Sequence, residues 1–199
     1  AVNIHRSPLC GRNFEYYSED PLVAGKSGAA MVRGMQSEHI GASVKHFCCN
    51  NKETNRKDSD SRVSERALRE IYLKGFEIAI TESQPMSIMT SYNLINGVHA
   101  ANNEDTCTKA ARCEWGFQGM IMTDWTTTEI DEKCTASGCM RAGNDLVMPG
   151  AFSDRDNLNQ ELADGTLSMD DLKACISRLV NIVWQSNQFE NAVPYKKVK

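Results

Sequence analysis

Five short apolar segments, each the length of a β-strand, constrain the fold of this 199-residue chain more than any other feature. They occupy residues 2–4, 42–47, 86–92, 119–124 and 144–148. Near-continuous apolar runs of this kind are typical of strands buried on both faces, as in a parallel sheet. Successive segments begin about 25–45 residues apart, which is the repeat of consecutive βα units. The sequence therefore predicts an α/β fold with a parallel sheet.

Helical patterns lie between these segments. Asp20 followed by Pro21 predicts a helix start, because Asp is a good N-cap and proline is favoured in the first turn. Ser168, with Asp171 three residues later, resembles a capping box and predicts another helix start. A long amphipathic helix is predicted from apolar residues three or four positions apart, namely Leu68, Ile71, Tyr72, Phe76 and Ala79.

Alternating βα units form either a doubly wound sheet or a barrel. No glycine-rich phosphate-binding motif follows any segment, which weakens the nucleotide-binding alternative. Polar residues at successive strand ends favour the barrel, whose catalytic groups gather at the carboxyl ends of its strands. We therefore expect a (β/α)₈ TIM-like barrel that is incomplete, with about five βα units, over residues 1–186. Residues 187–199 are polar and are expected to form a linker.

Composition and charge exclude several classes of protein. The 22 basic and 26 acidic residues argue against a nucleic-acid binder, and no apolar run reaches the length of a membrane span. The first residues lack the pattern of a signal peptide, so a cytoplasmic location is expected. The eight cysteines are then expected to be free thiols, with disulfides as an alternative. A zinc site of His46, Cys48 and Cys49 is a third possibility, although adjacent cysteines rarely both reach one ion.

Asp124 is the first candidate for a catalytic group. It ends an apolar segment and precedes Trp125. The carboxyl end of a barrel strand is where a nucleophile or general base is expected, and an aromatic ring beside it offers a flat wall for a sugar. As an alternative, Asp124 caps the next helix, because the three threonines at 126–128 also suit a helix start.

Five further polar residues follow the predicted strands. Lys45 and His46 end the second segment and suit recognition of hydroxyl or carboxylate groups. Tyr92 could orient a carboxylate by hydrogen bonding, whereas Arg12 offers fork-shaped donors to adjacent hydroxyls. Arg56 lies in a polar loop that forms either a ligand-facing rim or plain surface. An ion-paired lysine, a core histidine and a core tyrosine remain the structural alternatives.

Motifs along nearly the whole chain resemble those of one family, glycoside hydrolase family 3. The resemblance rests on RSPLCGRNFE (6–15), SEDP (18–21), KHF (45–47) with Asn50, Glu53 and Arg56, MTSYN (89–93), EWGF (114–117), TDW (123–125) and AGNDL (142–146). It implies a retaining exo-β-glycosidase of the β-glucosidase or β-xylosidase kind, with Asp124 as nucleophile and Trp125 beside the sugar. It also implies that an oligosaccharide or aryl β-glycoside is the substrate and that no cofactor or metal is needed. The implied substrate-binding residues are Arg12, Lys45, His46, Arg56 and Tyr92.

The sequence departs from one branch of this family. After KHF the chain continues CCNNKE, without the histidine-bearing loop of the single-domain hexosaminidases. The resemblance then implies the multidomain branch, whose acid/base glutamate lies on a following α/β sandwich domain. That glutamate would lie after Lys199, and an early sugar-binding aspartate would lie before Ala1.

Two alternatives to this interpretation stay open. If the resemblance misleads, the second catalytic carboxyl group could come from within the chain, with Glu15, Glu53, Glu70 and Asp145 as candidates. In a different class, the chain is a non-catalytic sugar-binding or assembly subunit that needs a partner chain. An incomplete barrel exposes sheet edges and apolar surface, so a homo-oligomer is also possible.

Overall fold

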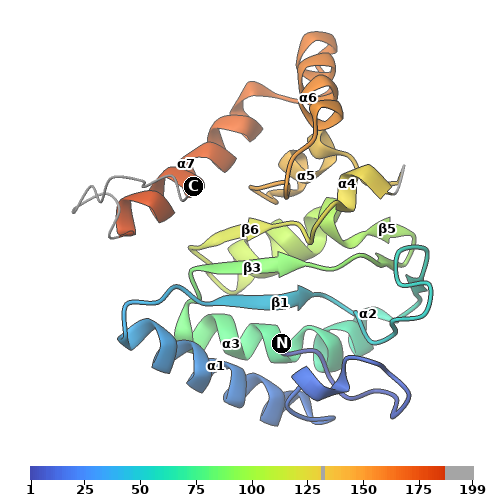
Figure 1. The fold of residues 1–199 in the computed structure, drawn as a ribbon, viewed down its shortest axis with the longest axis vertical. Helices are drawn as coiled ribbons and strands as arrows, with labels where there is room; N and C mark the ends of the chain where they lie inside the picture. Colours follow the sequence, from blue (N-terminus) through green and yellow to red (C-terminus); the bar gives the residue numbers. More distant parts are fainter. Residues whose placement is uncertain (131–132, 187–199) are drawn as a thin grey trace, which may run out of the picture.

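A parallel three-stranded sheet forms the centre of the protein, seen here in a computed structural model that describes residues 1–130 and 133–186. Its strand order is β1 (Ser43–Phe47), β3 (Ser87–Thr90) and β6 (Met120–Met122), as Figure 1 shows. The predicted parallel sheet is therefore confirmed, and three of the five apolar segments form its strands. The linker predicted at 187–199 lies outside the described residues.

The prediction that residues 2–4 and 144–148 form regular strands is wrong. Near residue 2 the backbone makes one bond to β1, from the Val2 amide to the Lys45 carbonyl at 3.0 Å, and the side chain of Asn3 bonds to β1 where a strand would use its backbone. Beyond β6, Leu146 forms a single parallel bridge with Met122. The 2–4 segment thus flanks β1 without joining its ladder, whereas the 144–148 segment bonds to β6 through the Asp145 and Leu146 amides and the Leu146 carbonyl, over a stretch too short to form a regular strand.

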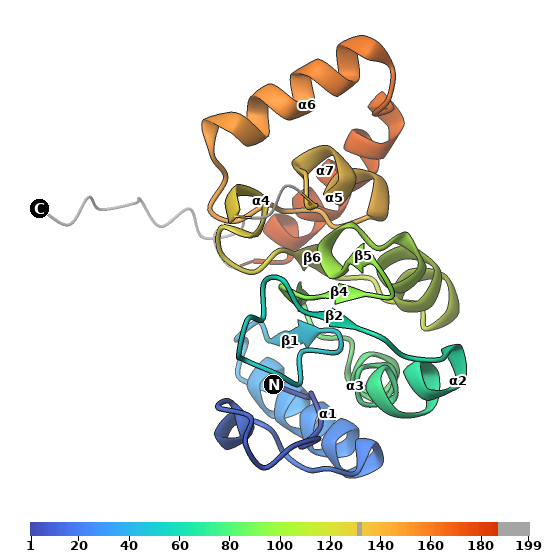
Figure 2. The same ribbon diagram turned by 90° about the vertical axis from the view of Figure 1, so that its right-hand side faces the viewer.

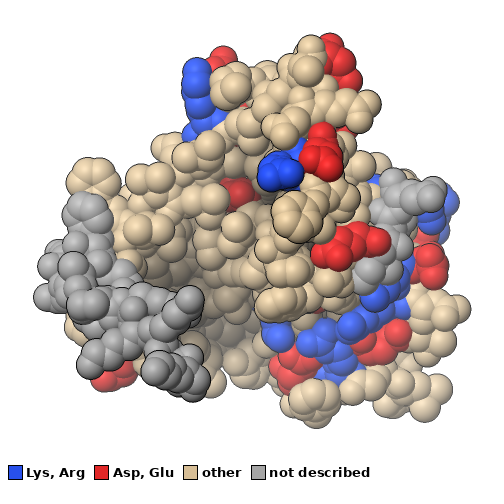
Figure 3. Space-filling model, turned by 45° about the horizontal axis from the view of Figure 1, so that its top comes forward, with Lys and Arg blue, Asp and Glu red and all other residues tan. Residues whose placement is uncertain are grey.

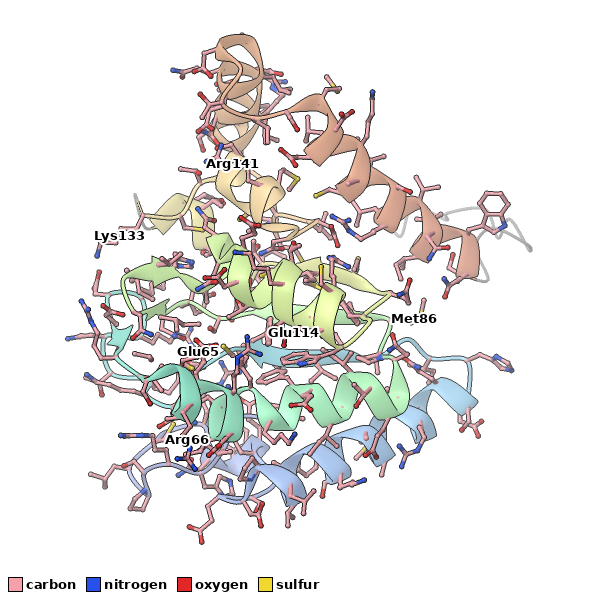
Figure 4. All side chains as sticks on the ribbon, turned by 180° about the vertical axis from the view of Figure 1, so that it is seen from behind. Glu65, Arg66, Met86, Glu114, Lys133 and Arg141 are labelled. Atoms are coloured by element: carbon pink, nitrogen blue, oxygen red, sulfur yellow. The ribbon has the colours of Figure 1, made fainter. Side chains whose placement is uncertain are left out.

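A row of helices covers one face of the sheet, as the view from behind in Figure 4 shows. It consists of α1 (Pro21–Ser37), α3 (Lys74–Ser83) and the π-helical segment η4 (Asp105–Glu114). The main core lies between them and the strands. Phe47 of β1 packs edge-on against Phe76 of α3, with ring centroids 5.0 Å apart, and against Trp115 at 6.1 Å.

The amphipathic helix predicted around 68–79 is present but divided. It runs as α2 (Glu65–Ala67), the π-helical segment η2 (Leu68–Tyr72) and then α3. Arg69 of η2 donates to Glu65 at 2.5 Å and to both carboxylate oxygens of Glu114 at 2.6 and 3.1 Å, so it links the first helical segment to η4. Figure 4 labels both of these glutamates.

Both predicted helix starts are confirmed. Asp20 accepts a hydrogen bond from the Leu22 amide at 2.7 Å at the start of α1. Ser168 accepts from the Asp171 amide at 3.1 Å at the start of α7 (Met169–Gln185). These contacts satisfy amide groups that have no partner inside their own helix.

A second group of helices lies beyond β6, at the top of Figures 1 and 2. It contains α5 (Ala136–Ala142), α6 (Phe152–Asp164) and α7, which share a small core of their own. A minor sheet of β2 (Asp60–Ser61), β4 (Leu94–Ile95) and β5 (Val98–His99) lies close to the carboxyl ends of the main strands. The remaining short elements are η1 (Asn13–Glu15), η3 (Ala100–Asn102) and α4 (Thr127–Ile130).

On the face in Figure 3, basic and acidic side chains are interspersed and no broad field of one sign is visible. Within residues 1–130 and 133–186, no helix is both long and apolar enough to cross a bilayer.

Candidate active site

The candidate site lies at the carboxyl ends of the three parallel strands. Asp124 follows β6 by two residues, His46 is the penultimate residue of β1, and Tyr92 follows β3 by two residues. His46 Nε2 lies 3.6 Å from Asp124 Oδ2, and the Tyr92 hydroxyl donates to the Trp125 carbonyl at 2.7 Å. Residues 46, 92 and 124–125, which are far apart in the sequence, therefore share one neighbourhood.

The Asp124 carboxylate is mostly buried, with the residue 8% exposed. Its Oδ1 accepts from the Trp125 amide at 2.8 Å, and its backbone carbonyl accepts from the Thr127 hydroxyl at 2.8 Å. The other carboxylate oxygen, Oδ2, is the one that faces His46. One oxygen is thus held by the backbone while the other points to the imidazole. Beside them, Trp125 is 58% exposed and presents its indole ring to solvent.

The end of β1 is irregular at the residues that reach the site. Its register with β3 shifts between Lys45 and Phe47, so the strict alternation of side chains is interrupted there. The Lys45–His46 and Phe47–Cys48 peptide bonds are cis. Lys45 Nζ lies 3.8 Å from Glu15 Oε2, whereas His46 is buried against Asp124.

The cationic residues predicted to bind substrate are paired with carboxylates. Arg12 forms an ion pair with Glu15, which Lys45 also approaches, and Arg56 donates to Glu53 at 2.9 Å. Glu15 and Glu53 were expected only as motif residues and as catalytic alternatives, and their pairing with arginine was not predicted. Opposite charges three residues apart, at 12/15 and 53/56, were the signal that could have revealed both pairs.

Arg56 also contacts the tyrosine of the site. Its guanidinium carbon lies 4.6 Å from the centre of the Tyr92 ring, and Lys57 Nζ lies 5.5 Å from the same centre. A cation over an aromatic face is favourable and fixes the orientation of both groups. Burial, followed by the negative charge of Asp124, raises the pKa of Tyr92 to about 12, so its hydroxyl stays protonated.

Two of the four candidates for a second catalytic carboxyl group, Glu70 and Asp145, are paired with arginine residues of the helices. Glu70 bonds to Arg66 one helical turn away, and both side chains are exposed. The Asp145 side chain is fully buried between Arg112 and Arg178 at 2.6 and 2.7 Å. Its Oδ2 also accepts from the Ile121 amide of β6, so this group serves the packing of the sheet. Glu15 and Glu53 do lie near the site, in the ion pairs described above.

The zinc hypothesis gains no support from the part of the chain that the structure describes. There, no group of three or more His, Cys, Asp or Glu side chains is arranged to hold a metal ion. Cys48 and Cys49 are both buried, and no disulfide joins any of the eight cysteines.

His46 is uncharged across the physiological range. Burial, and then the positive charges of Arg12 and Lys45, lower its pKa to about 2. A neutral imidazole donates from one ring nitrogen and accepts at the other. His46 can therefore form hydrogen bonds beside Asp124 without carrying a positive charge.

The depressed pKa of His46 makes stability depend on pH. Below the ordinary pKa of about 6.5 the unfolded chain binds a proton that the folded chain does not, so stability falls as the pH falls from there towards 2. We expect His46→Gln to remove up to about 1.4 kcal/mol per pH unit from this slope. Urea unfolding of both proteins between pH 4.5 and 7 measures it. Identical slopes would show that the pKa of His46 is the same in the folded and the unfolded chain.

Comparison with known proteins agrees with the resemblance seen in the motifs. Residues 1–182 match the family described as "Glycosyl hydrolase family 3 N terminal domain". Beta-glucosidase A of Butyrivibrio fibrisolvens is 62% identical over 155 residues, which are 78% of this chain and 18% of that protein. A beta-glucosidase of Ruminococcus albus is 44% identical over 193 residues, or 94% of this chain and 20% of that protein.

Solved structures give the same result for the fold. Beta-glucosidase 3B from Thermotoga neapolitana, solved in complex with glucose, superposes with a TM-score of 0.89 at 44% identity. The match covers 95% of this chain and 27% of that one. The present chain thus spans about a fifth of the curated relatives named above. By the family match and by these relatives, the chain belongs to glycosyl hydrolase family 3.

Proposed function

We propose that this chain is the nucleophile-bearing part of a retaining exo-β-glycosidase of the β-glucosidase kind. Its substrates would be oligosaccharides or aryl β-glycosides with a terminal, non-reducing β-D-glycosyl residue. The observation that carries the proposal is the Asp124 carboxylate, buried at the end of β6 with Oδ1 held by an amide and Oδ2 facing the neutral His46 at 3.6 Å. The β-glucosidase relatives support it.

In this mechanism Asp124 Oδ2 attacks the anomeric carbon as the aglycone oxygen leaves with a proton from a general acid. The result is a covalent glycosyl-enzyme, which water then hydrolyses with the same acid acting as base. The amide of Trp125 holds Oδ1 throughout, so the attacking oxygen keeps its direction. Two displacements at one carbon return the sugar in its original β configuration.

The remaining groups are proposed to bind the sugar. Lys45, Arg12 and Arg56 supply donors for hydroxyl groups, and each is held in place by a carboxylate. His46 offers Nε2, which lies 3.6 Å from the nucleophile, to a hydroxyl group of the sugar. Trp125, which is exposed, supplies a flat apolar wall for the sugar ring. Tyr92 keeps the loop after β6 in place through the Trp125 carbonyl.

We further propose that the sheet is one part of an incomplete (β/α)₈ barrel and that the acid/base lies on a different part of the same enzyme. The length of the relatives supports this proposal, because the chain covers only 18–20% of them. Retaining chemistry needs two carboxyl groups about 5–5.5 Å apart. In the part of the chain that the structure describes, Glu15 and Glu53 lie near the site, and both are occupied by ion pairs with lysine or arginine.

The proposal is tested by comparing the 199-residue chain with the complete polypeptide that contains it. We expect the complete polypeptide to hydrolyse an aryl β-glucoside with β-glucose as the first product by NMR. The chain alone should have little or no turnover, because it lacks the general acid. Rapid turnover by the chain alone would require an internal acid/base. Glucose binding without turnover by the complete polypeptide would instead indicate a non-catalytic sugar-binding subunit.

A further inference from the structure

The backbone that carries Lys45 and His46 is held by an unusual set of hydrogen bonds. Six consecutive carbonyl groups, from Lys45 to Asn50, each accept a bond from another segment or from a neighbouring residue. The first three accept from the Val2 amide at 3.0 Å, the Asn3 side chain at 2.9 Å and the Ser91 amide at 2.9 Å. The chain here is therefore fixed residue by residue.

Side chains hold the second half of this stretch. The Cys48 carbonyl accepts from the Ser91 hydroxyl at 2.8 Å, and the Cys49 carbonyl accepts from the Ser61 hydroxyl at 3.1 Å. The Asn50 carbonyl accepts from the Tyr16 hydroxyl at 2.9 Å. Most of the donors are side chains rather than backbone groups, so single substitutions can test their roles.

Asn3 is distinct among these donors because it holds His46 from both sides. Its Nδ2 donates to the His46 carbonyl at 2.9 Å, and its Oδ1 accepts from the His46 amide at 2.8 Å. Since an amide N–H can only donate and a carbonyl can only accept, the orientation of the Asn3 side chain is fixed. Asn3 is 3% exposed and lies 43 residues away in the sequence.

The ring of His46 has little else to orient it. In the described part of the chain, Nδ1 is buried without a hydrogen-bond partner, and Nε2 lies 3.6 Å from Asp124, beyond a normal hydrogen bond. Its position beside the nucleophile therefore depends on its packing and on its own backbone. That backbone is held through the two bonds from Asn3.

We propose that Asn3 is a positioning residue of the glycoside site, acting on His46 through the two hydrogen bonds to its backbone. This inference rests on the function proposed above. A displacement of about 1 Å can lower the rate of an enzyme by up to about 100-fold, even when the displaced group still lies in the site. Asn3 is thus expected to influence sugar binding and turnover without touching the sugar.

Asn3→Asp is the sharpest test, because it keeps the shape and the acceptor but replaces the donor. The carboxylate then faces the His46 carbonyl, and the two oxygens repel. Asn96→Asp is the matched control, since Asn96 accepts from the Val63 amide at 2.9 Å and donates to its carbonyl at 2.8 Å on an exposed turn. In the complete polypeptide we expect Asn3→Asp to weaken glucose binding and to lower kcat/KM by about 10–100-fold. Asn96→Asp should change each by less than about twofold.

A spectroscopic readout separates positioning from a general loss of stability. The imidazole resonances of His46 should shift in folded Asn3→Asp and stay unchanged in Asn96→Asp. Should Asn3→Asp fail to fold, Asn3→Ser replaces it, and unfolding of both would mean a structural role and overturn the proposal. Unchanged glucose affinity and an unchanged His46 signal in a folded variant would also overturn it. If the wild type itself binds no glucose, the proposed function fails, and the His46 signal still decides whether Asn3 positions the ring.

Discussion

Replacing Asp124 by asparagine is expected to lower kcat/KM for an aryl β-glucoside by about 10⁴-fold or more in the complete enzyme. An amide oxygen is a poor nucleophile and cannot form the glycosyl ester, so the double displacement stops at its first step. The fold should be retained, because the amide oxygen of asparagine can still accept from the Trp125 amide. The measurement is steady-state hydrolysis, with thermal unfolding as a check that the variant is folded.

Asp20→Asn is a suitable control for this experiment. Asp20 is an exposed N-cap of α1, and asparagine caps a helix about as well as aspartate. We expect its kcat/KM to stay within about twofold of the wild type. A comparable loss in the control would point to a general effect of the Asp-to-Asn change.

Asp124→Ala distinguishes a nucleophile from a residue that only shapes the site. Removing the carboxylate leaves space beside His46, into which a small anion such as azide can enter. Azide should then attack the anomeric carbon directly and restore part of the lost rate. One displacement inverts the centre, so the product would be the α-glycosyl azide. Wild-type activity in either variant would exclude Asp124 as the nucleophile.

Local sequence signals predicted the helices of this fold better than the edges of its sheet. Asp20 and Ser168 were sufficient to place two helix starts, because an N-cap depends on residues within one turn. The segment at 2–4 has the composition of a strand but bonds to β1 largely through the side chain of Asn3. Whether a short apolar segment joins a sheet depends on partners far away in the sequence, which its own residues do not specify.

The sequence was sufficient to predict which strand-end residues form the candidate site. It did not predict the contacts between them. The positions of Asp124, His46 and Tyr92 follow from where the parallel strands end. The bond from Tyr92 to the Trp125 carbonyl and the stacking of Arg56 on the Tyr92 ring depend on loop conformations. No periodicity in the sequence encodes such contacts.

Asp145 shows the limit of the strand-end argument most clearly. It occurs next to an apolar segment, as Asp124 does, but its amide bonds to the Ile121 carbonyl and its carboxylate to the Ile121 amide, alongside β6. There it also accepts from Arg112 of η4 and Arg178 of α7. One carboxylate thus joins the sheet, a covering helix and α7.

Asp145→Asn is therefore expected to destabilise the chain by about 3–5 kcal/mol, because two arginines lose the carboxylate that compensates them in a buried setting. Their side chains are only 11% and 25% exposed, so water replaces little of the lost interaction. Urea unfolding followed by tryptophan fluorescence measures the change. Asp105→Asn is the control, since its ion pair with Lys109 is exposed, and it should cost less than about 0.5 kcal/mol. A loss below about 1 kcal/mol at Asp145 would mean that the arginines find other partners and that α7 docks on β6 by apolar contacts instead.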